Sequence, residues 1–134
     1  MDSEALESLP FFSTLSPEGR RAVAGHAERI DVSEGTQLTG QEKPGYVFFV
    51  IERGRADVFQ DDRPLRELGE GDFFGEIALL HTGERTASVV AKTPMQLITV
   101  TESGFKRLVE TDPNAARECE AAIRERWAAP IIDR

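Results

Sequence analysis

The sequence predicts a mainly β domain, an antiparallel sandwich or barrel with helical segments before and after it. Short β-prone runs separated by turn residues recur every ~8–12 positions between about residues 30 and 100, a spacing typical of antiparallel all-β folds. Strands and helices do not alternate along this region, which disfavours a parallel doubly wound sheet. The expected order is therefore a helical segment, a compact β unit and two further helices.

The length and composition fit one domain spanning residues 1–134. The chain has 134 residues, 40% of them hydrophobic, which is enough for a substantial core. No run approaches the ~18 consecutive apolar residues of a membrane span, and the acidic N-terminus lacks the pattern of a signal peptide. Cys119 is the one cysteine, so no disulfide can form within the chain. We therefore expect a cytoplasmic domain without a membrane segment.

The charge distribution narrows the classes of partner. The chain carries 16 Lys and Arg against 24 Asp and Glu, a formal net charge of −8. Acidic residues outnumber basic ones in each of the segments 1–34, 35–101 and 102–134. Because nucleic-acid binding normally needs a basic face, we expect no direct binding of nucleic acid by this domain. An anionic ligand would require a local positive site.

The residue types also disfavour an enzyme or a metal site. The two histidines, His26 and His81, lie far apart in the sequence, with no carboxylates at ligand spacing around them. The sequence offers no pair of nucleophile and base either. We therefore expect no catalytic residue, no metal ligand and no bound cofactor other than a small-molecule ligand.

The N-terminal helical segment is predicted over residues 1–29. Its apolar anchors are interrupted by Pro10, and Ser16-Pro17 then has the pattern of an N-cap followed by proline at the first helical position. The helix that begins there is expected to run to about His26. The anchors are Leu6, Leu9, Phe11, Phe12 and Leu15, followed by Val23 and Ala27 on the inward face.

The β region is predicted over residues 30–101. Glycine, proline and aspartate clusters bound its β-prone runs, as expected for turns between antiparallel strands. The expected strands are 36–39, 46–52, 55–60, 65–68, 86–91 and 95–100.

Two C-terminal helices are predicted over residues 102–128. Ser103 is expected to cap a short helix that ends at about Val109, and Asp112-Pro113 repeats the pattern of a cap followed by proline. The second helix should bury one apolar stripe, because its apolar residues recur at spacings of three and four. These residues are Ala116, Cys119, Ile123 and Trp127.

Residues 74–89 interrupt the β pattern and carry the chemistry of a sugar-phosphate site. A short helical turn that starts at Gly75 exposes backbone N–H groups, which can bind an anion. Arg85 adds a guanidinium that can pair with a phosphate, and Glu76 adds a carboxylate that accepts hydrogen bonds from hydroxyl groups. Thr86 adds a small hydroxyl donor. As an alternative, Glu76 and Arg85 could form a purely structural salt bridge.

This segment resembles the phosphate-binding cassette of the cyclic nucleotide-binding domains, which include the catabolite activator proteins and the regulatory subunits of cyclic-AMP-dependent kinase. The matching residues are Phe74-Gly75-Glu76-Ile77-Ala78-Leu79 and Arg85-Thr86-Ala87-Ser88-Val89, with the spacing of the family between Glu and Arg. Earlier positions match as well: Phe11–Ser16, Gly35, Tyr46–Gly54 and Ala56-Asp57-Val58. The resemblance implies a jelly roll, or double-stranded β-helix, plus an N-terminal helix and C-terminal helices.

The resemblance also implies roles for individual residues. It implies that Glu76 accepts a hydrogen bond from the ribose 2′-hydroxyl and that Arg85 pairs with the exocyclic phosphate oxygen. Thr86 would hydrogen-bond the phosphate and reach the edge of the base. Trp127, in the last helix, is a candidate cap for the base, with core or dimer packing as its other interpretation. The other implied ligand-binding positions are Phe74, Gly75, Ile77, Ala78 and Ala87.

The implied function is a regulatory, ligand-sensing module for a 3′,5′-cyclic nucleotide. Cyclic AMP is favoured over cyclic GMP, although Thr86 is compatible with both. Closure of the C-terminal helices would transmit the signal to an effector domain or protein, or through a homodimer. The alternative is a nucleotide-free interaction or dimerisation domain of the same fold. It gains weight from Glu84, because many members of the family have proline at that position.

Overall fold

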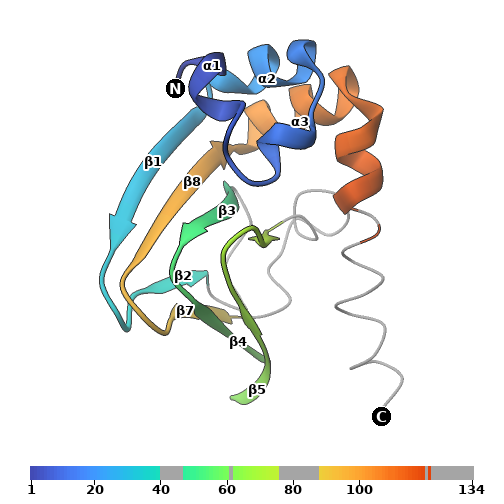
Figure 1. The fold of residues 1–134 in the computed structure, drawn as a ribbon. Coiled ribbons are helices and arrows are strands. Elements are labelled where there is room, and N and C mark those ends of the chain that lie inside the picture. The colour runs from blue at the N-terminus through green and yellow to red at the C-terminus, as the bar shows by residue number, and fades with distance from the viewer. Residues whose placement is uncertain (40–46, 61, 76–87, 120, 122–134) are drawn as a thin grey trace.

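Two four-stranded antiparallel sheets form the body of the protein, and the helices gather at one end of them (Figure 1). The computed structural model describes residues 1–39, 47–60, 62–75, 88–119 and 121. The strand orders are β1-β8-β3-β6 and β2-β7-β4-β5, so the chain passes repeatedly from one sheet to the other. This arrangement confirms the predicted antiparallel β-sandwich with flanking helices.

The strands and helices have the following bounds. The first sheet contains β1 (Ala27–Val32), β8 (Met95–Thr101), β3 (Val47–Arg53) and β6 (Phe73–Phe74). The second contains β2 (Gln37–Thr39), β7 (Ser88–Ala91), β4 (Ala56–Gln60) and β5 (Arg63–Leu68). The helices are α1 (Ser3–Leu6), a 3-10 turn (Phe12–Thr14), α2 (Pro17–Ala24) and α3 (Glu102–Thr111), and residues 113–119 are also helical.

The N-cap of α2 is where the sequence predicts it. The Ser16 hydroxyl accepts a hydrogen bond from the backbone N–H of Gly19, and Pro17 occupies the first helical position. The predicted end is wrong, because α2 stops at Ala24 rather than near His26. The chain turns there into β1, which begins at Ala27 and which the sequence pattern did not reveal.

Two details of the C-terminal prediction are also corrected. Thr101, at the end of β8, caps α3 by accepting a hydrogen bond from the backbone N–H of Gly104, so the helix starts earlier than a Ser103 cap would allow. In the following helical stretch, Ala115 and Cys119 are buried whereas Ala116 is half-buried. Ile123 and Trp127, which complete the predicted stripe, lie outside the described residues.

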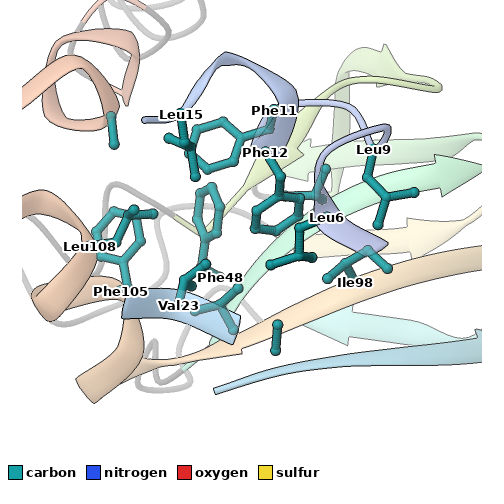
Figure 2. Close-up of a cluster of buried hydrophobic side chains, with 14 of the residues drawn as sticks. Leu6, Leu9, Phe11, Phe12, Leu15, Val23, Phe48, Ile98, Phe105 and Leu108 are labelled. Carbon is teal, nitrogen blue, oxygen red and sulfur yellow. The ribbon is translucent and has the colours of Figure 1, made fainter. Parts of the chain in front are cut away.

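The two faces of the first sheet contact two separate hydrophobic clusters. We call the cluster between this sheet and the helices the outer core, and the cluster between the two sheets the inner core. Side chains alternate along β3: Phe48 and Val50 belong to the outer core, whereas Phe49 and Ile51 belong to the inner core. Figure 2 shows the outer core, where helical residues from both ends of the chain surround Phe48.

Candidate functional site

The structure describes both ends of the candidate segment 74–89. Phe74 and Gly75 lie at one end, and Ser88 and Val89 lie at the other. The remaining predicted ligand-binding residues lie outside the described residues: Glu76, Ile77, Ala78, Arg85, Thr86, Ala87 and Trp127. The described part of the site consists of the elements that hold the two ends of this segment.

Phe74 anchors the start of the segment in the inner core. It pairs with Phe49 across β6 and β3, and the two rings stack with centroids 4.6 Å apart and an interplanar angle of 9°. Its side chain is buried, with only 5% exposed. The stacked rings therefore fix the first residue of the segment against β3, in packing that aromatic pairs favour.

Gly75 follows with a backbone conformation that suits glycine. Its φ is +99°, in the region that residues with a Cβ rarely adopt. The chain thus leaves the edge strand of the first sheet through a turn that a larger residue would strain. The sequence predicts a short helical turn that starts at Gly75; Gly75 itself has a left-handed φ, and the rest of that turn lies outside the described residues.

The other end of the segment enters the middle of the second sheet. Ser88 pairs with Phe59 and Val89 pairs with Val58, which places β7 beside β4. Val89 is 4% exposed and belongs to the inner core. Because β6 lies in the first sheet and β7 in the second, the two described ends of the segment are held by different sheets.

The N-terminal helical segment reaches the same region through aromatic side chains. Phe11 has a φ of +67° and contacts both Phe48 and Phe73, each with ring centroids 5.1 Å apart. Phe73 directly precedes Phe74 on β6. The sequence identified Phe11 as an apolar anchor, but its contact with the start of the candidate segment was not foreseen, because it joins residues far apart in the chain.

A buried carboxylate ties the N-terminal segment to the C-terminal helices. Asp112 is 2% exposed, and its side chain accepts hydrogen bonds from the backbone N–H groups of Ser16, at 2.7 Å, and Asn114, at 3.0 Å. Burial alone would raise the pKa of the Asp112 carboxyl, but the hydrogen bonds from Ser16 and Asn114 outweigh it and hold the pKa below its usual value. The Thr14 hydroxyl also donates to the carboxylate of Glu118 at 2.9 Å. Asp112, which the sequence predicts as a helix cap, therefore also links the N-terminal segment to the C-terminal helices.

The ends of β5 and β7 and the start of β4 carry a polar network. Glu67 accepts hydrogen bonds from Lys92, at 2.6 Å, and from Arg55, at 3.0 Å. Both lower the pKa of the Glu67 carboxyl, and the hydrogen bond from Lys92 has the larger effect. A pocket of about 650 Å³ adjoins this network, bounded by the turns at Gly54, Gly69 and Thr93. The lysine and arginine there share one carboxylate, so the geometry favours a structural cross-link over an anion site.

Arg66 is a residue that the sequence analysis did not single out. It lies on β5, opposite Val58 of the inner core, and its Nε atom is shielded from solvent. The signal that could have identified it is its position two residues before Leu68, because alternate residues of a strand share one face.

The described residues show neither a metal cluster nor a membrane helix. No group of three or more histidine, cysteine, aspartate or glutamate side chains among them could hold a metal ion. Within the same part of the chain, no helix is long and apolar enough to cross a membrane.

Comparisons with known proteins agree with this arrangement. A family model described as "Cyclic nucleotide-binding domain" matches residues 29–112, a stretch that contains the whole candidate segment. The chain is 37% identical over 121 residues to a cAMP-dependent protein kinase regulatory subunit of Aspergillus fumigatus, covering 89% of this chain and 29% of that protein. The chain thus spans less than a third of the length of this relative.

Solved structures show the same fold. The catabolite activator protein of Thermus thermophilus superposes with a TM-score of 0.76 at 26% identity, covering 91% of this chain and 60% of that one. The regulatory domain of Toxoplasma gondii PKA, crystallised with cAMP, gives a TM-score of 0.71 at 25% identity, covering 80% and 43%. The family match confirms the predicted family, and the matched relative is named as a regulatory subunit.

Proposed function

The chain belongs to the family of cyclic nucleotide-binding domains, and from this premise we propose that it senses a 3′,5′-cyclic nucleotide through residues 74–89. One observation carries the proposal. The two ends of this segment are fixed on different sheets, at Phe74-Gly75 and Ser88-Val89, and the left-handed Gly75 opens it. A ligand held there would contact both sheets and lie near the helices that carry the signal.

The binding chemistry that we propose follows the charges of the ligand. A cyclic phosphodiester carries one negative charge, which a single guanidinium and several backbone N–H groups can balance. Arg85 pairs with the phosphate and Glu76 accepts a hydrogen bond from the ribose 2′-hydroxyl. Thr86 hydrogen-bonds the phosphate and reaches the base. The backbone of the remaining predicted positions lines the ribose and phosphate: Gly75, Ile77, Ala78 and Ala87.

Cyclic AMP is the first candidate ligand. The names of similar proteins support it, since relatives from several fungi are cAMP-dependent protein kinase regulatory subunits. Cyclic GMP is the second candidate, because Thr86 is compatible with either base. Both ligands share the ribose-phosphate that Glu76 and Arg85 are proposed to hold, so their affinities should differ through the base. Titration with each ligand shows which base the site prefers.

The proposed output runs through the helices. Asp112 connects the start of α2 to the helical residues after α3, so the N-terminal and C-terminal helical segments are coupled at one buried carboxylate. A shift of these helices on nucleotide binding, with Trp127 closing over the base, would pass the signal to an effector domain, a protein partner or a second copy of the chain. The cytoplasmic location expected from the sequence stays a prediction.

The experiment is a calorimetric titration combined with a thermodynamic cycle. We expect heat from at least one of the two nucleotides. The cycle pairs Glu76→Ala with the 2′-deoxy form of the better ligand, and Glu70→Ala serves as an exposed control. A hydrogen bond to a charged group contributes roughly 1.5–3 kcal/mol, so each single change should weaken binding about tenfold or more.

The combined change decides the outcome. Together, Glu76→Ala and loss of the 2′-hydroxyl should weaken binding far less than the product of their separate effects, because both remove the same hydrogen bond. Fully multiplicative effects would refute the role of Glu76. The absence of heat from either nucleotide would refute the proposed ligand and favour the nucleotide-free interaction module.

A further inference from the structure

Strand β1 leaves one of its two edges open. It is the first strand in the order β1-β8-β3-β6, and among the described residues it pairs with β8 alone. Figure 1 shows it at the border of the first sheet, with β8 beside it. Such an edge presents backbone N–H and C=O groups on which another strand can pair. The register of β1 on β8 identifies these groups.

The open backbone groups in the middle of β1 belong to Arg29 and Asp31. The N–H of Thr101 donates to the carbonyl of His26 at 3.2 Å, and these two residues are opposite each other when the register of β1 and β8 is continued by one pair. Opposite residues alternate between hydrogen-bonded and non-hydrogen-bonded pairs along an antiparallel ladder. Counted in twos from His26, the even-numbered residues of β1 therefore bond to β8. Arg29 and Asp31 direct their N–H and C=O groups to the open edge.

The charged side chains of the same two residues are drawn away from this edge. Arg29 donates to Glu52 on β3 from Nε, at 2.8 Å, and from Nη2, at 3.1 Å. Asp31 accepts a hydrogen bond from Gln96 on β8 at 3.2 Å. Charged side chains commonly protect an edge strand from pairing, but these two are held across the sheet by neighbouring strands. The backbone groups of β1 are therefore accessible to another strand.

A second copy of β1 fits this edge in one register. When two copies run antiparallel with Ile30 opposite Ile30, Arg29 of each copy lies opposite Asp31 of the other. Each such pair exchanges two backbone hydrogen bonds, because both residues direct these groups outward. Each pair also places opposite charges face to face, and Arg29 keeps donors that Glu52 does not use. The neighbouring registers that still join outward groups place Arg29 opposite Arg29, or Asp31 opposite Asp31, and like charges disfavour both.

We propose that β1 is a homodimer contact, in which two copies pair antiparallel about Ile30 and join their first sheets into one continuous sheet. The occupant is a second copy because the charges along this edge are complementary to themselves. Ile30 is half-buried, and pairing brings its two copies to about 5 Å between Cβ atoms, which covers part of their remaining apolar surface. The contact is separate from the proposed nucleotide site, since β6, which leads into the candidate segment, forms the opposite edge of the sheet.

Sedimentation equilibrium of two charge reversals tests the contact. A single strand pair is a small interface, so the unaltered chain should form a weak dimer as its concentration rises towards about 1 mM. Asp31→Lys places a lysine opposite Arg29, and Arg29→Glu places a glutamate opposite Asp31. Each reversal acts twice in the symmetric contact and should weaken self-association about tenfold or more. Arg21→Glu, which reverses an exposed arginine on α2, is the matched control and should leave the dimer unchanged.

Mixing the two reversed chains gives the positive result. In an equimolar mixture each lysine faces a glutamate, and the unaltered Arg29 of one chain faces the unaltered Asp31 of the other, so the dimer should return. Thermal unfolding shows that each variant is folded. A chain that stays monomeric at about 1 mM would overturn the proposal. A dimer that both reversals leave intact, or a mixture that does not associate, would also overturn it.

A cross-link tests the register separately. Ile30→Cys should form a disulfide-linked dimer under mild oxidation, because the two copies of residue 30 face each other at a distance that a disulfide can span. Val32→Cys, which lies on the same face of the strand, is the matched control and should cross-link much more slowly, since residue 32 faces Glu28 of the second copy. The unaltered chain controls for Cys119, which is buried. Equal rates for the two variants would overturn the pairing about Ile30.

Discussion

The two faces of the first sheet support different parts of the molecule. The outer core joins the sheet to helical segments from before and after the β unit, and Phe48 contacts both Phe11 and Phe105 in it. The inner core joins the two sheets and contains Phe49 and Phe74, and Phe74 is the first residue of the candidate segment. Because side chains alternate between the two faces of β3, each buried residue of this strand packs either in the outer core, against the helices, or in the inner core, which contains the start of the candidate segment.

The largest expected effect on stability comes from a substitution in the outer core alone. Phe48 has no exposed surface and lies 4.8 Å from Phe105 and 5.1 Å from Phe11, measured between ring centroids. Phe48→Ala should lower the free energy of unfolding by about 3–5 kcal/mol, because it removes a large buried ring and leaves a cavity. Urea denaturation measures this change. The folded fraction should keep its nucleotide affinity within a few-fold, and a loss comparable to that of a binding-site variant would contradict the separation of the two faces.

The next effect concerns the connection between the helical segments. Asp112→Asn should lower the free energy of unfolding at pH 7 by about 1–3 kcal/mol, because two backbone N–H groups lose a charged acceptor. The folded pKa of Asp112 lies below its usual value of 3.8, so its contribution is complete above about pH 5. It declines as the pH falls through the folded pKa.

Denaturation curves at several pH values test this sign. The stability difference between the unaltered chain and Asp112→Asn should be constant between pH 5 and 7 and should shrink towards pH 3. A difference that grows on acidification would show that Asp112 is held as the neutral acid instead.

A smaller effect on stability is expected on the inner face, accompanied by weaker binding. Phe49→Leu removes the ring that stacks on Phe74 and should lower the free energy of unfolding by about 1–2 kcal/mol. Because Phe74 precedes Gly75, the dissociation constant of the nucleotide should also rise several-fold. Phe48→Leu is the matched control, which should lose comparable stability without this change in binding. If Phe49→Leu and Phe48→Leu changed the dissociation constant equally, the two faces of the first sheet would not differ in their effect on binding.

The sequence was most informative where the signal is local. The cap formed by Ser16 and Pro17 depends on four consecutive residues, so it was predictable. Most strands of the β region were also identified, because turn residues bound them. The exception at its start is β1, an edge strand in which Glu28, Arg29 and Asp31 are exposed and obscure the alternation.

Features that depend on pairing between distant segments were not predictable. β6 has only two residues and exists because it pairs with β3. The contact between Phe11 and Phe73, and the hydrogen bond from Ser16 to Asp112, each join parts of the chain that no sequence spacing relates. Likewise, only the register of β4 and β5 places Arg66 opposite Val58.

The most direct test of the central claim is the calorimetric titration of Arg85→Ala beside the unaltered chain. Loss of one partner from a desolvated charge pair costs roughly 2–5 kcal/mol, so the dissociation constant of the nucleotide should rise at least about 30-fold. Arg63→Ala, which removes an exposed arginine outside the segment, should bind like the unaltered chain. Equal affinity of Arg85→Ala and the unaltered chain would contradict a nucleotide site at residues 74–89.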